Sequence, residues 1–331
     1  MVKLEVFKIT TLCKRINYKK EKNNNMSKMY NRFTVRNEDT GEEIRMVLKN
    51  NEELTVTDRA RQLTDEQKNF LEKNNQLHEF THNLGGFIQM CYVKNELLFN
   101  ELEIEKANIS RLIYLATYID YNNREENLLV RYSENNKVTA LTREEIRSLL
   151  KLSERTFINF LNDMKSNNLI FVCNDKYYIS PDYFTKGKNK LTGAYTRIFI
   201  NTTKLLFENC NARQHKQLSY VYQLIPYMNH ELNVICNNPH ESDFAKLDKL
   251  GLKKICELLG MSLDKKSMYR FENDLLKFKI EVNNRSYYIF KRVIVKGGNG
   301  KYDYFVINPK IVWSGNNVEL IKDTVSSLFF K

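Results

Sequence analysis

The chain has 331 residues, of which 42% are hydrophobic, and its formal net charge is +12. The apolar content is sufficient for packed cores, and the positive charge favours an acidic partner, most commonly nucleic acid. Six widely spaced cysteines argue against a disulfide framework, and neither a signal peptide nor an apolar run of roughly 20 residues is recognisable, so we expect a cytoplasmic protein without a membrane partner.

The first elements along the chain are a hairpin and a short helix. Apolar residues alternate in Phe33–Arg36 and Ile44–Val47 on either side of a turn that contains glycine, which is typical of a β-hairpin. Thr64 and Gln67 have the spacing of a capping box, which predicts a short helix that ends near Lys73.

A repeated motif divides the rest of the chain. Residues 179–187 carry Ile two positions before Pro181 and Gly six positions after it, and residues 307–315 have the same spacing around Pro309. The chain contains only 4 prolines, so two matched positions are informative. The distance between the copies is that of a small domain, which predicts two tandem domains rather than a solenoid.

The first repeat, residues 85–194, is predicted to contain helices followed by a hairpin. Its expected elements are a strand at 85–93, a helix at 109–121, a strand at 128–132, a helix at 142–150, a helix that begins after Ser153, and a hairpin of 169–173 with 177–179. Thr142 and Glu145 form a capping box, and Asn-Asp is a typical hairpin turn. A helix-turn-helix followed by a β-hairpin is a winged helix.

The second repeat, residues 195–331, has the same order. Its expected elements are a strand at 195–201, helices at 215–228 and 252–259, a helix from Ser262 or Asp264 to about Phe278, a hairpin of 280–282 with 287–295, and a further turn at 297–300. The predicted fold is α+β and mostly helical. A basic arm, β-hairpin and short helix at 1–84 precede two tandem winged-helix domains at 85–194 and 195–331.

The last helix of each helix-turn-helix has an apolar stripe and a polar face. Phe157, Leu161 and Met164 form the stripe in the first repeat. Donor-rich side chains beside such a stripe contact base edges and phosphates in the major groove, and basic hairpin residues contact phosphates. The candidate DNA-binding residues are Arg155, Thr156, Asn159, Asn162, Lys165, Lys265, Lys266, Tyr269, Arg270, Asn273, Arg285, Lys291 and Arg292.

The whole pattern resembles the RepL-type replication initiators of plasmids and phages. The similar features are the strand, the apolar helix, the turn ending in Leu-Leu-x-(Leu/Met)-Ser, the recognition helix, the wing and the Ile-Asn-Pro motif with its following Gly. The second repeat matches more fully, because it keeps Asn308 where the first has Ser180. The resemblance covers 85–190 and 195–316. Members of that family usually have one winged helix, so the duplication is a departure from it.

One segment suggests a different chemistry. His78, Glu79, His82 and Gly85 match the HExxHxxG pattern, in which two histidines bind zinc and the glutamate activates water. The third histidine of the extended pattern is replaced by Ile88. We therefore expect a polar linker here, and a zinc metalloprotease with a DNA-binding domain is the lesser alternative.

The predicted function is non-enzymatic, sequence-specific binding of double-stranded DNA, in replication initiation for a plasmid or phage replicon. A phage or plasmid transcriptional regulator with the same domains is the alternative. The expected DNA partner carries origin or operator repeats. Host replication proteins and a second copy of the chain are further candidate partners. No catalytic residue, metal or cofactor is expected.

Overall fold

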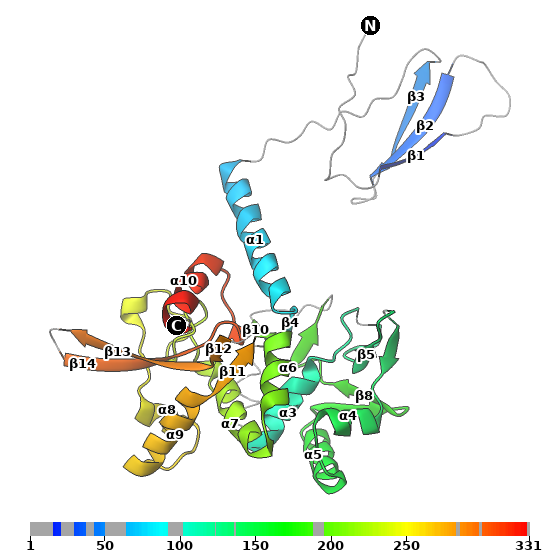
Figure 1. Ribbon diagram of the computed structural model, residues 1–331. Coiled ribbons are helices and arrows are strands. Elements are labelled where there is room, and N and C mark those ends of the chain that lie inside the picture. Colours follow the sequence, from blue (N-terminus) through cyan, green and yellow to red (C-terminus); the bar gives the residue numbers. More distant parts are fainter. Residues whose placement is uncertain are drawn as a thin grey trace. The chain divides into compact units, whose positions relative to one another are not determined.

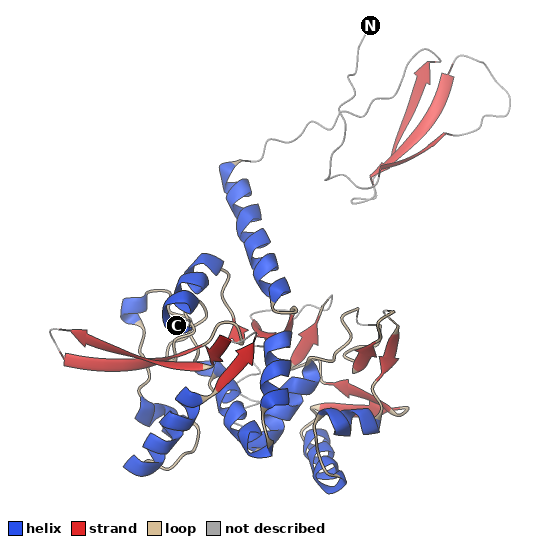
Figure 2. Ribbon diagram, in the orientation of Figure 1, coloured by secondary structure: helices blue, strands red, loops and turns tan. Residues whose placement is uncertain are grey.

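The computed structural model describes residues 16–20, 30–37, 43–49, 64–91, 102–122, 124–135, 137–187, 195–282, 285–297 and 300–329. Within these residues the protein is α+β, built from helices and small antiparallel sheets (Figure 2). Residues 1–68 and 69–331 form two compact units (Figure 1). None of the helices described is long and apolar enough to cross a bilayer.

The first unit contains a three-stranded antiparallel sheet. Its strands are β1 (Ile16–Lys20), β2 (Tyr30–Asn37) and β3 (Glu43–Lys49), in the order β1-β2-β3. The β2–β3 pair, in which Val35 lies opposite Ile44, confirms the predicted hairpin. Its predicted turn lies outside the described residues. Strand β1 comes from the segment that we assigned to a basic arm.

Helix α1 (Asp65–Asn83) begins at the predicted capping box. The Thr64 N–H donates to Gln67 Oε1 at 3.1 Å, and the Gln67 N–H donates to Thr64 Oγ1 at 3.3 Å. The prediction of a helix end near Lys73 and a polar linker after it was wrong, because one continuous helix covers both. Leu77 and Phe80 pack against the apolar cluster around Trp313, and this packing stabilises the second half of the helix.

A four-stranded sheet joins the two repeats. Its order is β15 (Val312–Trp313), β10 (Tyr195–Phe199), β4 (Phe87–Cys91) and β9 (Phe184–Lys186), and all its pairs are antiparallel. The central strands come from different repeats, and Gln89 lies opposite Arg197. Each outer strand lies within the repeated proline motif of its own repeat, between the proline and the glycine. The sheet therefore relates the two repeats by an approximate twofold arrangement.

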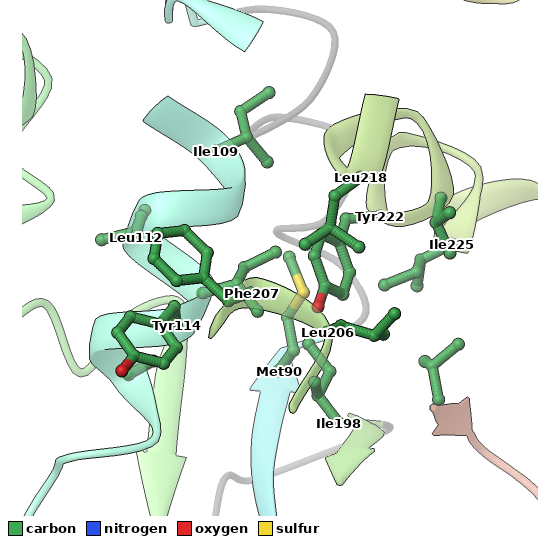
Figure 3. Packing of buried hydrophobic residues seen from close by; sticks show 14 of the residues in the cluster. Met90, Ile109, Leu112, Tyr114, Ile198, Leu206, Phe207, Leu218, Tyr222 and Ile225 are labelled. Atoms are coloured by element: carbon green, nitrogen blue, oxygen red, sulfur yellow. The ribbon is translucent and has the colours of Figure 1, made fainter. Parts of the chain in front are cut away.

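Three helices pack around this sheet into a single core. They are α3 (Lys106–Ala116), α6 (Ile200–Asn209) and α7 (Ala212–Gln223), and α3 packs mainly on α7 (Figure 3). The Tyr114, Phe207 and His215 rings stack in sequence, with successive centroids 4.1 Å apart. The repeats predicted as domains 85–194 and 195–331 thus share a sheet and a core within one compact unit.

The remaining elements of the first repeat keep the predicted order, with one additional strand at 138–140 that was not predicted. They are β5 (Val130–Tyr132), β6 (Val138–Ala140), α4 (Arg143–Leu149), α5 (Glu154–Ser166), β7 (Ile170–Cys173) and β8 (Lys176–Ile179). The capping box of Thr142 with Glu145 is confirmed. Asn174 and Asp175 both have positive φ in the tight turn between β7 and β8, as the hairpin prediction requires.

The second repeat has a longer set of strands. Besides β10, α6, α7 and β15, it contains two short 3₁₀ helices, η2 (Ile225–Tyr227) and η3 (Phe244–Lys246). Its other helices are α8 (Leu252–Leu258), α9 (Lys265–Lys277) and α10 (Val318–Phe329). Its other strands are β11 (Lys279–Val282), β12 (Arg285–Tyr288), β13 (Phe290–Gly297) and β14 (Gly300–Ile307). The predicted strand 287–295 is interrupted at Ile289. The buried Ile289 donates its N–H to the Phe278 carbonyl and accepts a hydrogen bond at its own carbonyl from the Asn308 N–H. The chain passes at this residue from β12, which pairs with β11, to β13, which pairs with β14.

Candidate nucleic-acid interface

Helix α5 has a polar face, and its orientation is set by the apolar residues on the opposite side of the helix, which are buried. Ser153 caps the helix by accepting a hydrogen bond from the Thr156 N–H, and the Thr156 side chain is half-buried. The apolar side of the helix is buried in the common core. Four of the predicted DNA-binding side chains are exposed, with no hydrogen bond or ion pair to the described part of the chain: Arg155, Asn159, Asn162 and Lys165.

Helix α9 presents the equivalent face in the second repeat. Its N-cap is Asp264, which accepts a 2.9 Å hydrogen bond from the Ser267 N–H and a 2.7 Å hydrogen bond from the Ser262 hydroxyl. Hydrogen bonds from Ser267 and Ser262 lower the pKa of Asp264 to about 2, so it is ionised at neutral pH and stabilises the helix start. The side chains of Lys265, Lys266, Tyr269 and Arg270 are exposed. Asn273 is half-buried and donates to the Tyr269 carbonyl at 2.9 Å.

A carboxylate on each of these helices accepts a hydrogen bond from one of the two central helices, α3 and α7. Asp163 on α5 accepts a 2.6 Å hydrogen bond from the Asn108 side chain on α3. Asp274 on α9 accepts a 3.3 Å hydrogen bond from the Gln217 side chain on α7. Both contacts lie in the second half of the helix, so the first turns, which carry most of the predicted DNA contacts, remain accessible.

The two faces differ in charge. Helix α9 carries four cationic residues and two carboxylates, whereas α5 carries two of each. In the first repeat, Arg143 and Arg147 of α4 both pair with Glu154, the first residue of α5, whereas the first residue of α9 is Lys265. The second repeat therefore offers the stronger positive field.

The predicted wing residues have different environments. Arg292 on β13 pairs with Glu272 on α9 and with Asp303 on β14, and this ion triad fixes the hairpin to the helix. Lys291 lies with its ammonium 3.8 Å from the Tyr288 ring centroid. The Arg285 side chain lies outside the described residues. Arg292 has a structural role in this arrangement, so we do not carry it into the interface that we propose.

Sequence reasoning missed one basic residue near α9. Lys216 on α7 is exposed and lines a groove of about 370 Å³ together with Tyr220, Arg270 and Phe271. The packing of α7 beside α9 brings Lys216 and Arg270 into the same groove. An exposed lysine on a predicted helix was the only signal in the sequence, and it does not indicate which neighbouring helix it approaches.

The zinc-protease motif is helical but incomplete as a metal site. His78 and His82 are exposed on α1, with ring centroids 6.2 Å apart. Among the residues that the structure describes, no group of three His, Cys, Asp or Glu side chains is arranged to hold a metal ion.

Helices α5 and α9 both lie toward the lower edge of the second unit in Figure 1, on either side of α3 and α7.

Comparison with protein-family models, with curated proteins and with solved structures finds no match. The function is therefore inferred from the residues of this chain.

Proposed function

We propose that each repeat is a winged helix, and that residues 69–331 bind double-stranded DNA sequence-specifically with α5 and α9 as recognition helices. The observation that carries this proposal is the pair of exposed, donor-rich faces at equivalent positions of two repeats, toward the same edge of one compact unit (Figure 1). The role is non-enzymatic.

The two helices contribute unequally. Exposed Lys265, Lys266 and Arg270 give α9 most of the electrostatic attraction to phosphates. The exposed Asn159 and Asn162 on α5 suit base edges better than long-range attraction, since an asparagine amide can form paired hydrogen bonds with adenine. We therefore assign affinity mainly to α9 and much of the sequence discrimination to α5.

The direct test is binding of the full chain to labelled duplexes that tile the DNA around its own gene. At fixed salt, Arg270→Ala is expected to cost roughly 1–3 kcal/mol on the preferred duplex. The matched control is Lys322→Ala, which removes an exposed cation from α10 and is expected to leave affinity nearly unchanged. Equal affinity of Arg270→Ala and the parent protein on every duplex would exclude α9 as a recognition helix.

The biological role that we propose is initiation of plasmid or phage replication, and the alternative is transcriptional regulation with the same domains. A plasmid that carries only the gene and its flanking DNA separates the two. An initiator sustains replication of that plasmid, and Arg270→Ala abolishes it. A regulator leaves replication unaffected but changes expression of a reporter placed behind the same DNA.

A further inference from the structure

A polar cavity lies where the two repeats meet, and none of its lining residues belongs to the proposed DNA-binding faces of α5 and α9. Its volume is about 250 Å³, and it lies among the end of α3, strands β5 and β9, and helix α6. Three cationic side chains line it: Arg131 from β5, Lys186 from β9 and Lys204 from α6. Thr117, Tyr118, Val130 and Tyr132 complete its lining.

The two lysines are short of negative partners. Lys186 Nζ donates a 2.7 Å hydrogen bond to the Thr117 carbonyl, and Lys204 Nζ lies 4.0 Å from the Tyr118 ring centroid. Within the described part of the chain, no carboxylate oxygen lies within 4.0 Å of either ammonium nitrogen. Burial, together with the neighbouring Lys204 charge, lowers the pKa of Lys186 to about 8, and burial also lowers the pKa of Lys204.

The carboxylates that attract the two lysines are hydrogen-bonded to other groups. Asp120 accepts a 2.5 Å hydrogen bond from the Tyr132 hydroxyl and lies 3.7 Å from the Arg124 guanidinium. Glu208 accepts a 3.1 Å hydrogen bond from the Tyr114 hydroxyl. Both act on the lysines only through longer-range attraction, which raises the pKa of Lys186 and of Lys204 against the effect of burial.

Two ammonium groups in a partly buried cavity repel each other and lose hydration, so an anion that contacts both would stabilise the folded protein. A phosphate group offers several acceptor oxygens and two negative charges, which suits a donor set of two ammonium groups. Arg131 also lines the cavity, but its side chain is 62% exposed and pairs with Glu145 at 2.9 Å. The positive charge that no close carboxylate balances is therefore that of Lys186 and Lys204.

We propose that this cavity binds a phosphate group through Lys186 and Lys204. The phosphate comes either from a free phosphate monoester or inorganic phosphate, or from the backbone of bound DNA. Because α6 belongs to the second repeat while β5 and β9 belong to the first, the ligand contacts both repeats. Its binding stabilises the unit in which α5 and α9 are held.

The first experiment titrates the full chain with inorganic phosphate at pH 7, with ionic strength held constant by sodium chloride. We expect saturable binding of one phosphate per chain by calorimetry. At about ten times the Kd, the melting temperature is expected to rise by about 2 °C or more, because the ligand binds the folded state only. No heat of binding and no shift beyond that of chloride would overturn a site for free phosphate.

The matched variants are Lys204→Gln and Lys322→Gln. The Lys204 ammonium makes no hydrogen bond to the described part of the chain, so its replacement removes the charge at the cost of only the contact with the Tyr118 ring. We expect Lys204→Gln to weaken phosphate binding at least about tenfold, as the loss of a charged hydrogen bond does, and Lys322→Gln to leave it unchanged. If Lys204→Gln does not fold, Lys204→Met provides the same test.

Duplex affinity at fixed salt distinguishes the two sources of phosphate. Weaker phosphate binding with unchanged duplex affinity in Lys204→Gln assigns the cavity to a free phosphate ligand. Weaker duplex binding without any response to free phosphate assigns it to the DNA backbone. The proposal fails if the parent protein does not respond to phosphate and Lys204→Gln binds the duplex as tightly as the parent.

Discussion

Gly187 and Gly315 end the repeated proline motif, and each lies where a side chain would collide with a neighbour. Gly187 has a φ of +73°, and a Cβ there would overlap the Tyr121 carbonyl oxygen. A Cβ on Gly315 would lie 2.7 Å from Trp313 Nε1 and would overlap the Glu231 carboxylate. The repeated glycine therefore reflects close approach of the chain after the outer strand of each repeat.

Gly187→Ala is expected to lower the free energy of unfolding by about 2–4 kcal/mol, because it adds left-handed strain to a backbone collision. Urea denaturation measures the change. Gly251→Ala is the matched control, since a Cβ at Gly251 meets no atom within 4 Å, and we expect it to change stability by less than about 1 kcal/mol. Equal effects of the two substitutions would contradict the collision at Gly187.

At the scale of elements, the ion triad of Arg292, Glu272 and Asp303 determines how α9 is held against the β13–β14 hairpin. Glu272 is buried on α9, where the equivalent residue of α5 is the apolar Leu161. The second repeat thus replaces an apolar contact with a charged one that reaches the hairpin. A buried carboxylate of this kind specifies geometry more than it adds stability.

Glu272→Ala is expected to destabilise the protein by about 1–2 kcal/mol, since Arg292 keeps Asp303 and remains 31% exposed in its side chain. We also expect weaker binding in the DNA assay proposed above, because α9 loses its ion pair with the hairpin. Glu257→Ala removes a surface carboxylate that pairs with Lys254 at 3.1 Å, and about 0.5 kcal/mol or less is expected from it. The interpretation fails if both variants retain the parent's stability and affinity.

The elements that the sequence predicted well are those with local signals. The capping boxes at Thr64 and Thr142, and the tight turn at Asn174, depend on residues close in the chain, and all three are confirmed. The break at Ile289 was missed because the chain changes its partner strand there, from β11 to β14, and the later strand is not a local signal. The full length of α1 was missed because its second half is stabilised by tertiary packing on the Trp313 cluster.

At the scale of the whole molecule, the sequence indicated a duplication but not how the copies combine. The pairing of Gln89 with Arg197 joins strands far apart in the chain, and no local pattern specifies such a partner. The same reason applies to the candidate sites. The polar faces of α5 and α9 follow from helical periodicity, whereas the cavity with Lys186 and Lys204 exists only after β9 and α6 come together.

The stack of Tyr114, Phe207 and His215 links helices of both repeats and makes stability depend on pH. Burial lowers the pKa of His215 to about 4, with smaller contributions from the charges of Arg111 and Lys151. An unfolded histidine binds a proton near pH 6.5, so protons favour the unfolded state in this range. The stabilisation from neutral His215 is complete above about pH 6.5 and is lost as the pH falls toward 4.

His215→Phe keeps an aromatic ring on Phe207 but cannot be protonated. We expect its melting temperature to fall less between pH 7 and pH 5 than that of the parent protein, and thermal melts at several pH values measure this. His78→Ala removes an exposed histidine of α1 and is expected to leave the pH dependence unchanged. Parallel pH profiles for His215→Phe and the parent would exclude a role for this ring.

The shared sheet and core predict that residues 69–331 unfold in one cooperative transition. Trp313 is the only tryptophan of the chain, and it is fully buried in the second repeat. Leu112→Ala creates a cavity in α3 of the first repeat and is expected to cost about 2–5 kcal/mol. If the repeats are one unit, Trp313 fluorescence and far-ultraviolet circular dichroism will report the same lowered urea midpoint.

The control is Ile158→Ala on α5, whose side chain is 43% exposed, so we expect a change within about 0.5 kcal/mol. Two independent domains would behave differently. The circular dichroism of Leu112→Ala would then show two unfolding steps, of which only the first repeat's step has a lowered urea midpoint. Trp313 fluorescence would keep the urea midpoint of the parent protein. Coincident shifts support one unit, because α3 packs directly on α7 and the strands β4 and β10 pair across the repeats. In that case a substitution in either repeat changes the stability of both α5 and α9, and DNA affinities of core variants must be compared at matched folded fractions.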